Sequence, residues 1–332
     1  MTDAAEKNEI LPPVELSSSL TKRPVSGGAE RWLGVPIKCL DHGFVYLADY
    51  AGNDQSIEQA ARVSYGEGTR KSSETVGLIR YLRRHDHTTP FEMVDLKFHA
   101  RMPIFVARQW VRHRTASINE YSARYSIVRE EFYVPEAGVL AQQSKSNRQG
   151  REEPLTAVQA EKVREHLRMA AEGEYDVYRG LLNDDGSGLP VNPDEPMVAR
   201  ELARAPLGTF FYTEWYWKVN LHNFMHFARL RMDPHAQLEI RVYAEAMGRI
   251  VKDAFPIAWK AFEDYELAAK KFSAPELQVL TKLLGGKRVR FSNEEIDAAA
   301  AAAGLTNRRE RSEMVDKFGQ LGFLEKGSSG SG

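Results

Sequence analysis

The feature that most constrains the fold is a stretch in which polar and apolar residues alternate and then give way to a helical pattern. Val94, Leu96, Phe98 and Ala100 are apolar, whereas the residues between them are charged or polar. A period of two residues predicts a strand with one buried face. Pro103 follows, and its fixed backbone angle suits the first turn of a helix. We therefore expect this strand to lie in a sheet and to lead directly into a helix.

Strands and helices are both expected along the rest of the chain. Runs of β-branched and aromatic residues predict extended segments over about 43–50 and 210–219. Asn53 precedes a helical pattern and belongs to the residue types that favour the start of a helix. Apolar spacing predicts further helices over 75–84, 103–111, 156–182, 195–205 and 221–272, with a break at 233–234, and three short helices within 273–327.

The composition changes along the chain and divides it into three segments. Residues 1–33 are rich in Ser, Pro and charged residues, so we expect a flexible N-terminal tail. Residues 34–270 carry the strand and helix patterns and are predicted to form the main domain. Within it, 140–155 lacks an apolar pattern and is predicted to be a mobile surface loop. Residues 271–332 are predicted to form a helical C-terminal extension with a Ser/Gly tail.

Charge and cysteine content exclude several classes of protein. The 332 residues include 45 Lys and Arg against 46 Asp and Glu, so a basic cluster is local and does not indicate a protein that coats nucleic acid. Cys39 is the only cysteine, which excludes an intramolecular disulfide and a cysteine-based zinc site. We find no apolar stretch of membrane-spanning length and no signal-peptide core, so we expect a cytoplasmic protein without a membrane partner.

Glycine-rich phosphate-binding motifs are absent from the sequence. Gly66 and Gly68 lack the third glycine of a dinucleotide turn. Gly285-Gly286-Lys287 is followed by Arg288, where a hydroxyl residue would be needed. A dinucleotide, if bound, is therefore held in another way.

An arginine-rich segment is the strongest candidate for a binding site. Arg112-His113-Arg114 is followed, after seven residues, by Ser122. Guanidinium groups bind phosphate oxygens two at a time, while Glu120 and Ser122 offer an acceptor and a hydroxyl, so the mixture suggests a nucleotide. If the chain is extended after Arg114, Glu120, Ser122 and Arg124 would share one face.

A basic helix face paired with acids is the simpler alternative for this segment. Glu120 is the only acidic residue between Arg101 and Arg129. That scarcity of acids argues for a ligand or partner that compensates the positive charge. The basic residues concerned are Arg101, Arg108, Arg112, Arg114, Arg124 and Arg129.

Histidines and arginines in the second half of the chain are further candidates. His222 and His226 lie four residues apart on a predicted helix, but no glutamate stands between them as in a hydrolytic zinc site, so no metal is expected. Arg229 and Arg231 lie in an apolar stretch, where low dielectric would favour stabilisation of an anion on a base ring. One of the two arginines can instead pair with an acid such as Glu239.

The Arg112-His113-Arg114 motif with Ser122 resembles the signature of the flavin-dependent thymidylate synthases. The resemblance extends over about residues 36–268. Further matching blocks are Ala60–Ser64, His87–Glu92, Pro103–Trp110, Arg200–Arg204 and Leu230–Gln237. The resemblance implies a mixed α/β (α+β) fold in which helices surround an antiparallel sheet. It also implies a homotetramer whose active sites lie at subunit junctions.

The activity that this resemblance implies is the methylation of dUMP to dTMP. 5,10-Methylenetetrahydrofolate would supply the carbon, NADPH the reducing equivalents, and FAD would pass the hydride. Arg231 would bind the uracil and favour its deprotonated form. Ser122 lacks a fixed base beside it and is interpreted as a positioning hydroxyl.

The same resemblance implies roles for individual residues. Those expected to hold dUMP are Gln109, Arg112, Glu120, Ser122, Arg124, Arg204 and Arg231. Those expected to contact FAD are Thr89, Arg112, His113, Arg114, Glu120, Asn220, His222 and His226, with Ser64 and His87 as additional candidates. Positions 222 and 226 carry histidine where other members carry arginine or asparagine, so these contacts are expected to differ in kind.

Three other interpretations fit the sequence less well. A thiol nucleophile would have to be Cys39, which lies outside every polar cluster and is better explained as a small buried residue. Basic residues after position 286 raise the possibility of a nucleic-acid-binding unit, but acids are interleaved among them, which favours helices docked on the core or mediating assembly. A flavin- and folate-dependent RNA methyltransferase would need the missing glycine-rich motif.

Overall fold

The computed structural model describes residues 9–20, 22–63, 75–145, 150–284, 290–321 and 323. The chain divides into two compact units. Unit 1 comprises residues 1–70 and 87–260, and unit 2 comprises 71–86 and 261–332. The predicted C-terminal extension therefore shares its unit with a helix from the first third of the chain.

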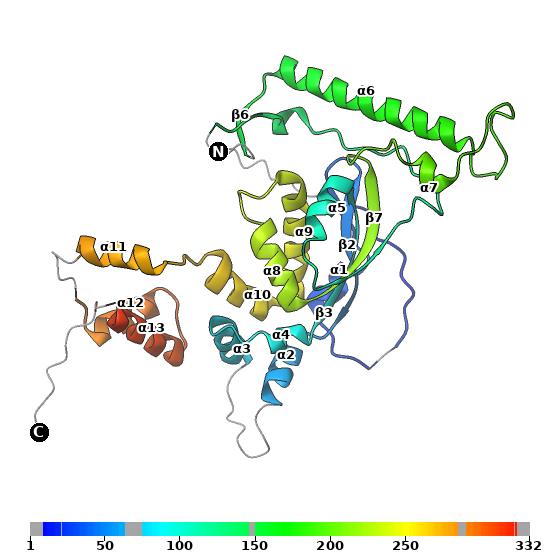
Figure 1. The fold of residues 1–332 in the computed structure, drawn as a ribbon. Coiled ribbons are helices and arrows are strands. Elements are labelled where there is room, and N and C mark those ends of the chain that lie inside the picture. Colours follow the sequence, from blue (N-terminus) through cyan, green and yellow to red (C-terminus); the bar gives the residue numbers. More distant parts are fainter. Residues whose placement is uncertain are drawn as a thin grey trace, which may run out of the picture. The chain divides into compact units, whose positions relative to one another are not determined.

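A five-stranded antiparallel sheet is the centre of unit 1 (Figure 1). Its strands follow the order β1 (Ile37–Cys39), β2 (Gly43–Ala51), β3 (Asp95–Pro103), β7 (Tyr212–Asn220) and β4 (Ser117–Glu120). β3 and β7 pair along nine residues, from Asp95 opposite Asn220 to Pro103 opposite Tyr212. The alternation that predicted β3 is confirmed, because Leu96, Phe98 and Ala100 are fully buried.

Helices cover the buried face of this sheet. α5 (Ile104–Trp110), α8 (Leu221–Arg231) and α9 (Leu238–Ala254) pack against one another and against the strands. α5 starts directly after Pro103, as the sequence predicted. Unit 1 thus confirms the expected α+β class with an antiparallel sheet and surrounding helices.

Trp110 joins these layers at the last residue of α5. Its side chain is fully buried. The ring lies 5.4 Å from Trp215 and 5.2 Å from Trp217 on β7, 5.2 Å from Phe227 on α8 and 5.9 Å from Tyr243 on α9, measured between centroids. Burial of aromatic rings on this scale stabilises by several kcal/mol (~3–5 kcal/mol for one such residue), so the end of α5 is fixed in place.

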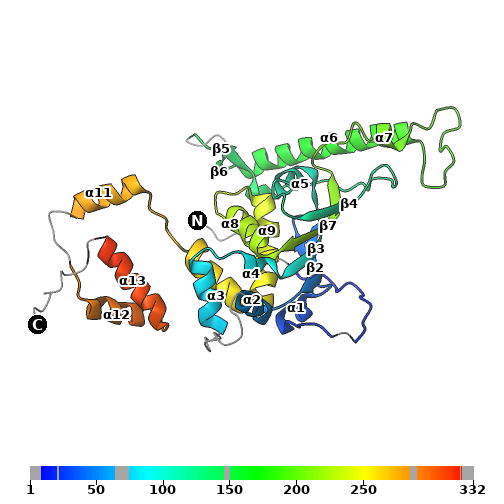
Figure 2. The same ribbon diagram turned by 60° about the horizontal axis from the view of Figure 1, so that its bottom comes forward.

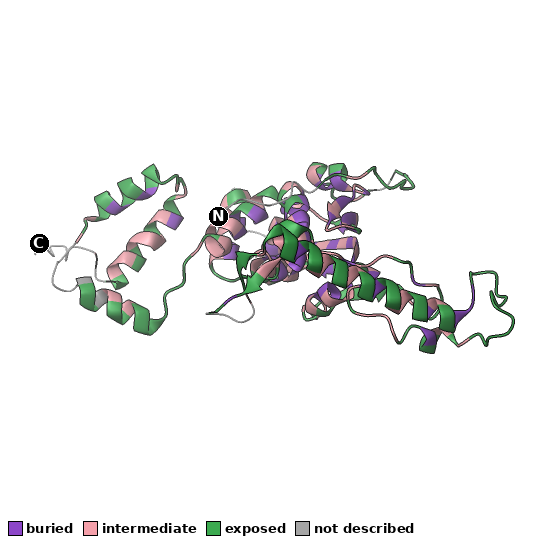
Figure 3. Cartoon of the chain, turned by 90° about the horizontal axis from the view of Figure 1, so that it is seen from above, coloured by how far each residue is buried: buried purple, intermediate pink, exposed green. Residues whose placement is uncertain are grey.

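The other elements of unit 1 lie around this centre. They are α1 (Gly27–Trp32), α2 (Asp54–Arg62), α4 (Thr89–Glu92), a 3₁₀ turn (Ala137–Val139), β5 (Ala141–Gln143), β6 (Arg151–Pro154), α6 (Ala157–Leu182), α7 (Arg200–Ala203) and most of α10 (Pro256–Phe262). α6 is capped by Thr156 and ends at Asn183, whose φ is 47°. Much of its surface is exposed (Figure 3). Both ends of this helix were predicted correctly, because caps are local signals.

Three sequence expectations are corrected by the structure. Little structure was expected before residue 34, yet α1 forms and buries Ala29 and Trp32, because Trp32 donates to Asp253 near the end of α9. The expected mobile loop 140–155 contains the antiparallel pair β5 and β6 (Figure 2). Of the helix expected over 195–205, only α7 is helical.

Unit 2 is built from helices. It contains α3 (Thr75–Arg84), a π-helical turn (Glu263–Leu267), α11 (Ala274–Leu284), α12 (Asn293–Ala302) and α13 (Arg308–Gln320). The three helices expected within 273–327 are confirmed. Among the described residues, no helix is long and apolar enough to cross a membrane.

Ion pairs join α3 to α13 inside unit 2. The Arg80 guanidinium donates to Glu310 at 3.0 and 3.2 Å and to Asp264 at 2.7 Å. Arg84 donates to Glu313 at 2.7 Å. The Glu310 side chain is only 6% exposed, and Tyr265 also donates to it. Glu310 is therefore the acceptor on which the contact between α3 and α13 depends most.

Replacing Glu310 with Ala should destabilise unit 2. Arg80 would lose two hydrogen bonds in a poorly solvated place, and we expect the opening free energy of α13 to fall by about 2–3 kcal/mol. Hydrogen exchange of the α13 amides measures this quantity. Asp316→Ala, an exposed position on the same helix, is the matched control. Equal protection in the two variants would contradict the assigned role of Glu310.

Candidate functional site

The arginine-rich motif lies in the turn between α5 and the edge strand β4. Arg108, Arg112 and Arg114 are exposed. None of the three forms an ion pair with the part of the chain that the structure describes. Three permanent positive charges thus remain available to an anionic ligand or to a neighbouring subunit.

Other arginines of the segment are paired with acids. Arg101 contacts Glu214 at 3.0 Å and Glu131 at 3.1 Å. Arg124 contacts Glu201 at 3.4 Å, with both side chains more than half exposed. The alternative of a basic surface neutralised by acids therefore holds for part of the segment, and the acids come from elements that the local sequence does not reveal.

Arg231 and His113 form the first candidate cluster, together with Gln109 and His226. Arg231, at the end of α8, donates through Nε to Nε2 of His113 at 3.1 Å and through Nη2 to the Gln109 carbonyl at 3.4 Å. The Gln109 side-chain amide donates to Gln237. The His113 ring lies 5.8 Å from the His226 ring. We call these four residues the Arg231 cluster.

Titration of His113 is altered by this environment. Burial, and then the positive charge of Arg231, lower the pKa of His113 to about 4. Burial also lowers the pKa of Arg231, which stays a cation because its ordinary value is so high. At neutral pH the imidazole is thus uncharged and accepts the proton that Arg231 donates, so the guanidinium is held in one orientation.

A cavity of about 380 Å³ forms the second candidate site. Its lining includes Glu120 at the end of β4, Ser122 in the following segment, Arg204 after α7 and Thr213 on β7. Thr213 Oγ1 donates to Glu120 Oε1 at 2.6 Å. We call this cavity the Glu120 pocket. It brings an acceptor, a hydroxyl and a cation together from segments that are far apart in the sequence.

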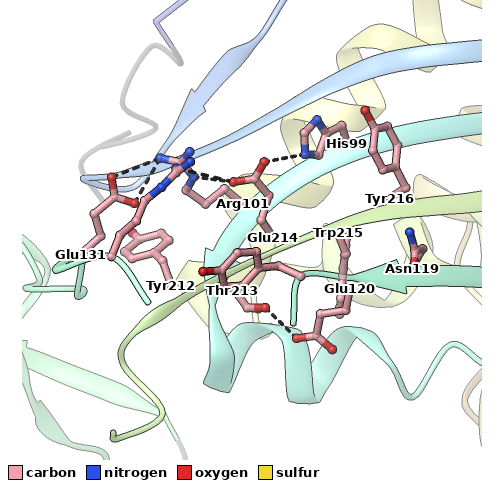
Figure 4. A pocket seen from close by; sticks show the side chains of 12 residues that line it. His99, Arg101, Asn119, Glu120, Glu131, Tyr212, Thr213, Glu214, Trp215 and Tyr216 are labelled. Carbon is pink, nitrogen blue, oxygen red and sulfur yellow. Dashed lines mark hydrogen bonds and ion pairs between the residues drawn. The ribbon is translucent and has the colours of Figure 1, made fainter. Parts of the chain in front are cut away.

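A second cavity of about 300 Å³ adjoins the Glu120–Thr213 contact (Figure 4). It also includes Glu120 and Thr213 in its lining. Glu214 there contacts His99 at 2.7 Å and Arg101 at 3.0 Å. The hydrogen bond from His99, followed by Arg101, lowers the pKa of Glu214 to about 2. The charges in this second cavity are therefore largely neutralised within the chain.

Candidate flavin contacts follow the length of α8. Thr89 begins α4, which packs against α8, and Asn220 caps the first turn of α8 by accepting from Asn223 at 2.9 Å. His222 and His226 follow one turn apart, which places both on one side of the helix. Arg231 ends α8, and His113 lies beside it. His222 and His226 can therefore both address a ligand on one side of α8.

The structure alters the expected placement of some candidates. Ser122 and Arg124 do not continue the extended strand of Glu120, because β4 ends there and the chain turns at 123–125. The suggested pair between Arg229 or Arg231 and Glu239 is wrong: the buried Glu239 accepts from Arg151 at 2.6 Å and from Tyr133 at 3.1 Å. His87 is exposed before α4, and Ser64 lies outside the described residues.

Two further sequence interpretations bear on the chemistry. Cys39 is buried in β1, and burial raises the pKa of its thiol well above the usual value, as expected for a packing residue. Among the described residues, no group of three or more His, Cys, Asp or Glu side chains is arranged to hold a metal ion. Thr213 was missed by the sequence analysis, since one threonine in an aromatic strand carries no signal of its own.

The fold and these clusters define an α+β protein with an arginine-rich site for an anionic ligand. The sequence matches the family described as thymidylate synthase complementing protein over residues 46–257. It is 53% identical over 296 residues to the flavin-dependent thymidylate synthase of Gluconobacter oxydans, covering 89% of this chain and 91% of that protein. The chain therefore belongs to the family of flavin-dependent thymidylate synthases.

A second relative and a solved structure refine the comparison. The flavin-dependent thymidylate synthase of Rickettsia conorii is 49% identical over 300 residues, covering 90% of this chain and 99% of its own length. The UMP/dUMP methylase PolB of Streptomyces cacaoi, solved with 5-Br dUMP, is 34% identical with a TM-score of 0.60, and the match covers 70% of this chain and 99% of that one. Because the match to the Rickettsia protein covers 90% of this chain, it must include part of residues 271–332. That relative therefore shares part of the extension.

The His113 ring should titrate with a midpoint near pH 4. An unfolded histidine titrates near pH ~6.5, so between these values the unfolded chain binds more protons, and this residue lowers stability as pH falls through that window. NMR of labelled histidine measures the midpoint, with His113→Asn identifying the signal. In Arg231→Gln the midpoint should move upward. A midpoint above about 6 in the unmodified protein would refute the described environment.

Proposed function

We propose that this chain converts dUMP to dTMP by reductive methylation, with FAD as cofactor. 5,10-Methylenetetrahydrofolate would be the carbon donor and NADPH the reductant. The observation that carries the proposal is the Glu120 pocket, where Glu120, Ser122 and Arg204 meet although they come from separate segments. The name of the Streptomyces relative, a UMP/dUMP methylase, supports the substrate class.

The dUMP phosphate would be held by arginines. Arg204 lines the Glu120 pocket, and Arg124 lies on the segment that follows Ser122. A guanidinium can bind two phosphate oxygens at once, and the partner that the described residues provide for Arg124, Glu201, is exposed and easily given up. Ser122 would donate its hydroxyl to the nucleotide, and Glu120 would accept from it.

Recognition of the uracil would fall to Gln109, Arg112 and Arg231. The Arg231 guanidinium is partly withdrawn from water and held by the neutral His113, so its charge acts strongly on a nearby ring oxygen. This charge would favour the base in its N3-deprotonated form, which makes carbon 5 more electron-rich. Because the buried thiol of Cys39 is not available for addition at carbon 6, activation by charge takes the place of a nucleophile.

The residues expected to bind one nucleotide do not all line the Glu120 pocket. The lining of the Glu120 pocket includes Ser122 and Arg204 but neither Gln109 nor Arg231. Under the proposed roles, however, one nucleotide needs Gln109 and Arg231 as well as Ser122 and Arg204. We infer that a neighbouring subunit supplies the Arg231 cluster, in keeping with a homotetramer that has active sites at its junctions.

The residues along α8 fit FAD in chemical type. Arg112 and Arg114 are exposed cations suited to a pyrophosphate. Thr89, Asn220, His222 and His226 offer hydrogen-bonding groups. His113, Glu120, Ser64 and His87 complete the proposed contacts. Bound flavin would supply the hydride chemistry, which no side chain of this protein can perform. The protein's part would be to orient the nucleotide and exclude water.

Basic residues of unit 2 are paired with acids. Within unit 2, Arg309 contacts Glu313 at 3.1 Å and Arg311 contacts Asp297 at 3.3 Å, so basic residues of the extension are engaged with acids, which disfavours nucleic acid as a partner. Residues 34–270 are proposed to form the catalytic domain and residues 271–332 the extension. A cytoplasmic location is proposed on the unpaired Cys39, which suits a reducing compartment.

The purified protein should be yellow and should form dTMP only when dUMP, methylenetetrahydrofolate and a reductant are all present. Visible absorption with and without dUMP measures flavin binding and substrate proximity together. Arg231→Ala should lower kcat by at least about 100-fold, because it removes the charge that activates the base. A protein that binds no FAD under any condition would end the proposal.

Cys39→Ala is the control that tests in the same assay whether the thiol takes part in the reaction. It should retain activity within about threefold and lose only a little stability, because the thiol serves packing. A folded Cys39→Ala protein without activity would contradict activation without a thiol.

Mixed oligomers should reveal a shared site. Glu120→Ala and Arg231→Ala chains should each be inactive alone, whereas co-expressed chains should recover about a quarter of the normal activity, because one site in four would receive two intact halves. Native mass spectrometry verifies mixing. Mixed oligomers that stay inactive would show that each site is contained in one chain.

A further inference from the structure

Thr213 is a side chain to which neither the motif nor the family resemblance gave a role. Its hydroxyl donates to Glu120 Oε1 at 2.6 Å, and the side chain is buried, with 6% exposure (Figure 4). The two residues are 93 positions apart in the sequence. The contact therefore exists only because of the way β4 and β7 pair.

Strand register explains why these two side chains meet. Glu120 lies opposite Trp215 in the antiparallel pair, so both side chains point to the same face. Thr213, two residues before Trp215, also points to that face and is the diagonal neighbour of Glu120. On its other side Thr213 pairs with Met102 of β3, which places it inside the sheet. Thr213, the donor, is thus on a strand paired on both sides, and Glu120, the acceptor, is on an edge strand.

Glu120 needs such a partner because its surroundings leave it free to move. All four residues of β4 are exposed, and the strand is paired on one side only. The side chain of a glutamate has several rotamers of similar energy. It lines both cavities, so a released carboxylate could turn away from the Glu120 pocket toward the second one. A β-branched threonine with a fixed rotamer can hold the carboxylate at the Glu120 pocket.

Only one carboxylate oxygen is used by this contact. Within the described residues, Oε1 accepts from Thr213 and Oε2 has no hydrogen bond to the chain. The hydroxyl of Thr213 therefore orients the group without occupying the oxygen that would face a ligand. An acceptor held in this way binds a donor of the ligand, such as a sugar hydroxyl, without first being ordered.

We propose that Thr213 is a positioning residue that orients Glu120 for nucleotide binding. This inference rests on the proposed function, in which Glu120 accepts from dUMP. In this role Thr213 acts through Glu120. Its hydroxyl, and not its bulk, is the part that matters.

The test is a dUMP titration of FAD-saturated protein, followed by the visible flavin spectrum. Thr213→Val keeps the shape and removes the donor, and we expect its Kd for dUMP to rise about tenfold, the effect of losing one hydrogen bond to a charged group. Thr213→Ser keeps the hydroxyl and should stay within about threefold. Thr209→Val, the same change at an exposed position before β7, should not alter the Kd.

Two further comparisons separate positioning from general stability. Thr213→Val should add no loss of affinity to a Glu120→Ala protein, because the group it orients is already absent. Thermal midpoint and FAD content should be similar in Thr213→Val and Thr213→Ser. If Thr213→Val does not fold, Thr213→Ala is compared with Thr213→Ser, since these two differ only by the hydroxyl.

The outcomes distinguish this inference from the proposed function. Unchanged dUMP affinity in Thr213→Val, or an equal loss in the Glu120→Ala protein, would overturn the positioning role alone. An unmodified protein that binds FAD but no dUMP at any concentration would overturn the proposed function and this inference with it.

Discussion

Burial of Trp110 is the interaction on which the placement of the site depends. Its ring packs against Trp215, Trp217 and Phe227, so the last residue of α5 cannot shift relative to β7 and α8. The turn that carries Arg112, His113 and Arg114 starts one residue later. The ring of His113 then lies 4.9 Å from Phe227 and within reach of Arg231. An apolar contact thus decides where the polar groups of the motif can act.

The sheet edge carries Glu120, which lines the Glu120 pocket. β4 is short and exposed, and the chain turns directly after it, which frees Glu120 and Ser122 from regular pairing on their outer side. Edge strands with unpaired groups are available to other molecules, whether a ligand or another copy of the chain. The combination of a rigid central strand, β7, with this edge gives the Glu120 pocket both a fixed wall and an accessible opening.

Charge is distributed unevenly along the arginine-rich segment. Tertiary structure supplies acids to Arg101 and Arg124, but none among the described residues to Arg108, Arg112 and Arg114. Like charges that are left uncompensated destabilise a folded chain, so their retention indicates that an anion or a subunit contact balances them. The extension shows the opposite arrangement, since Glu310 and Glu313 engage the arginines of α3 within unit 2.

The sequence by itself determined the elements that depend on neighbours along the chain. The alternation in β3, the proline before α5, the caps of α6 and the spacing of Arg112 and Ser122 are local signals, and they led to the correct fold class and family. Tertiary structure alone decided that Trp32 anchors α1, that Arg231 meets His113 and that Thr213 meets Glu120. These contacts join residues 221, 118 and 93 positions apart, through strand register and helix packing. No local pattern encodes such a contact, because its energy exists only once the sheet has formed.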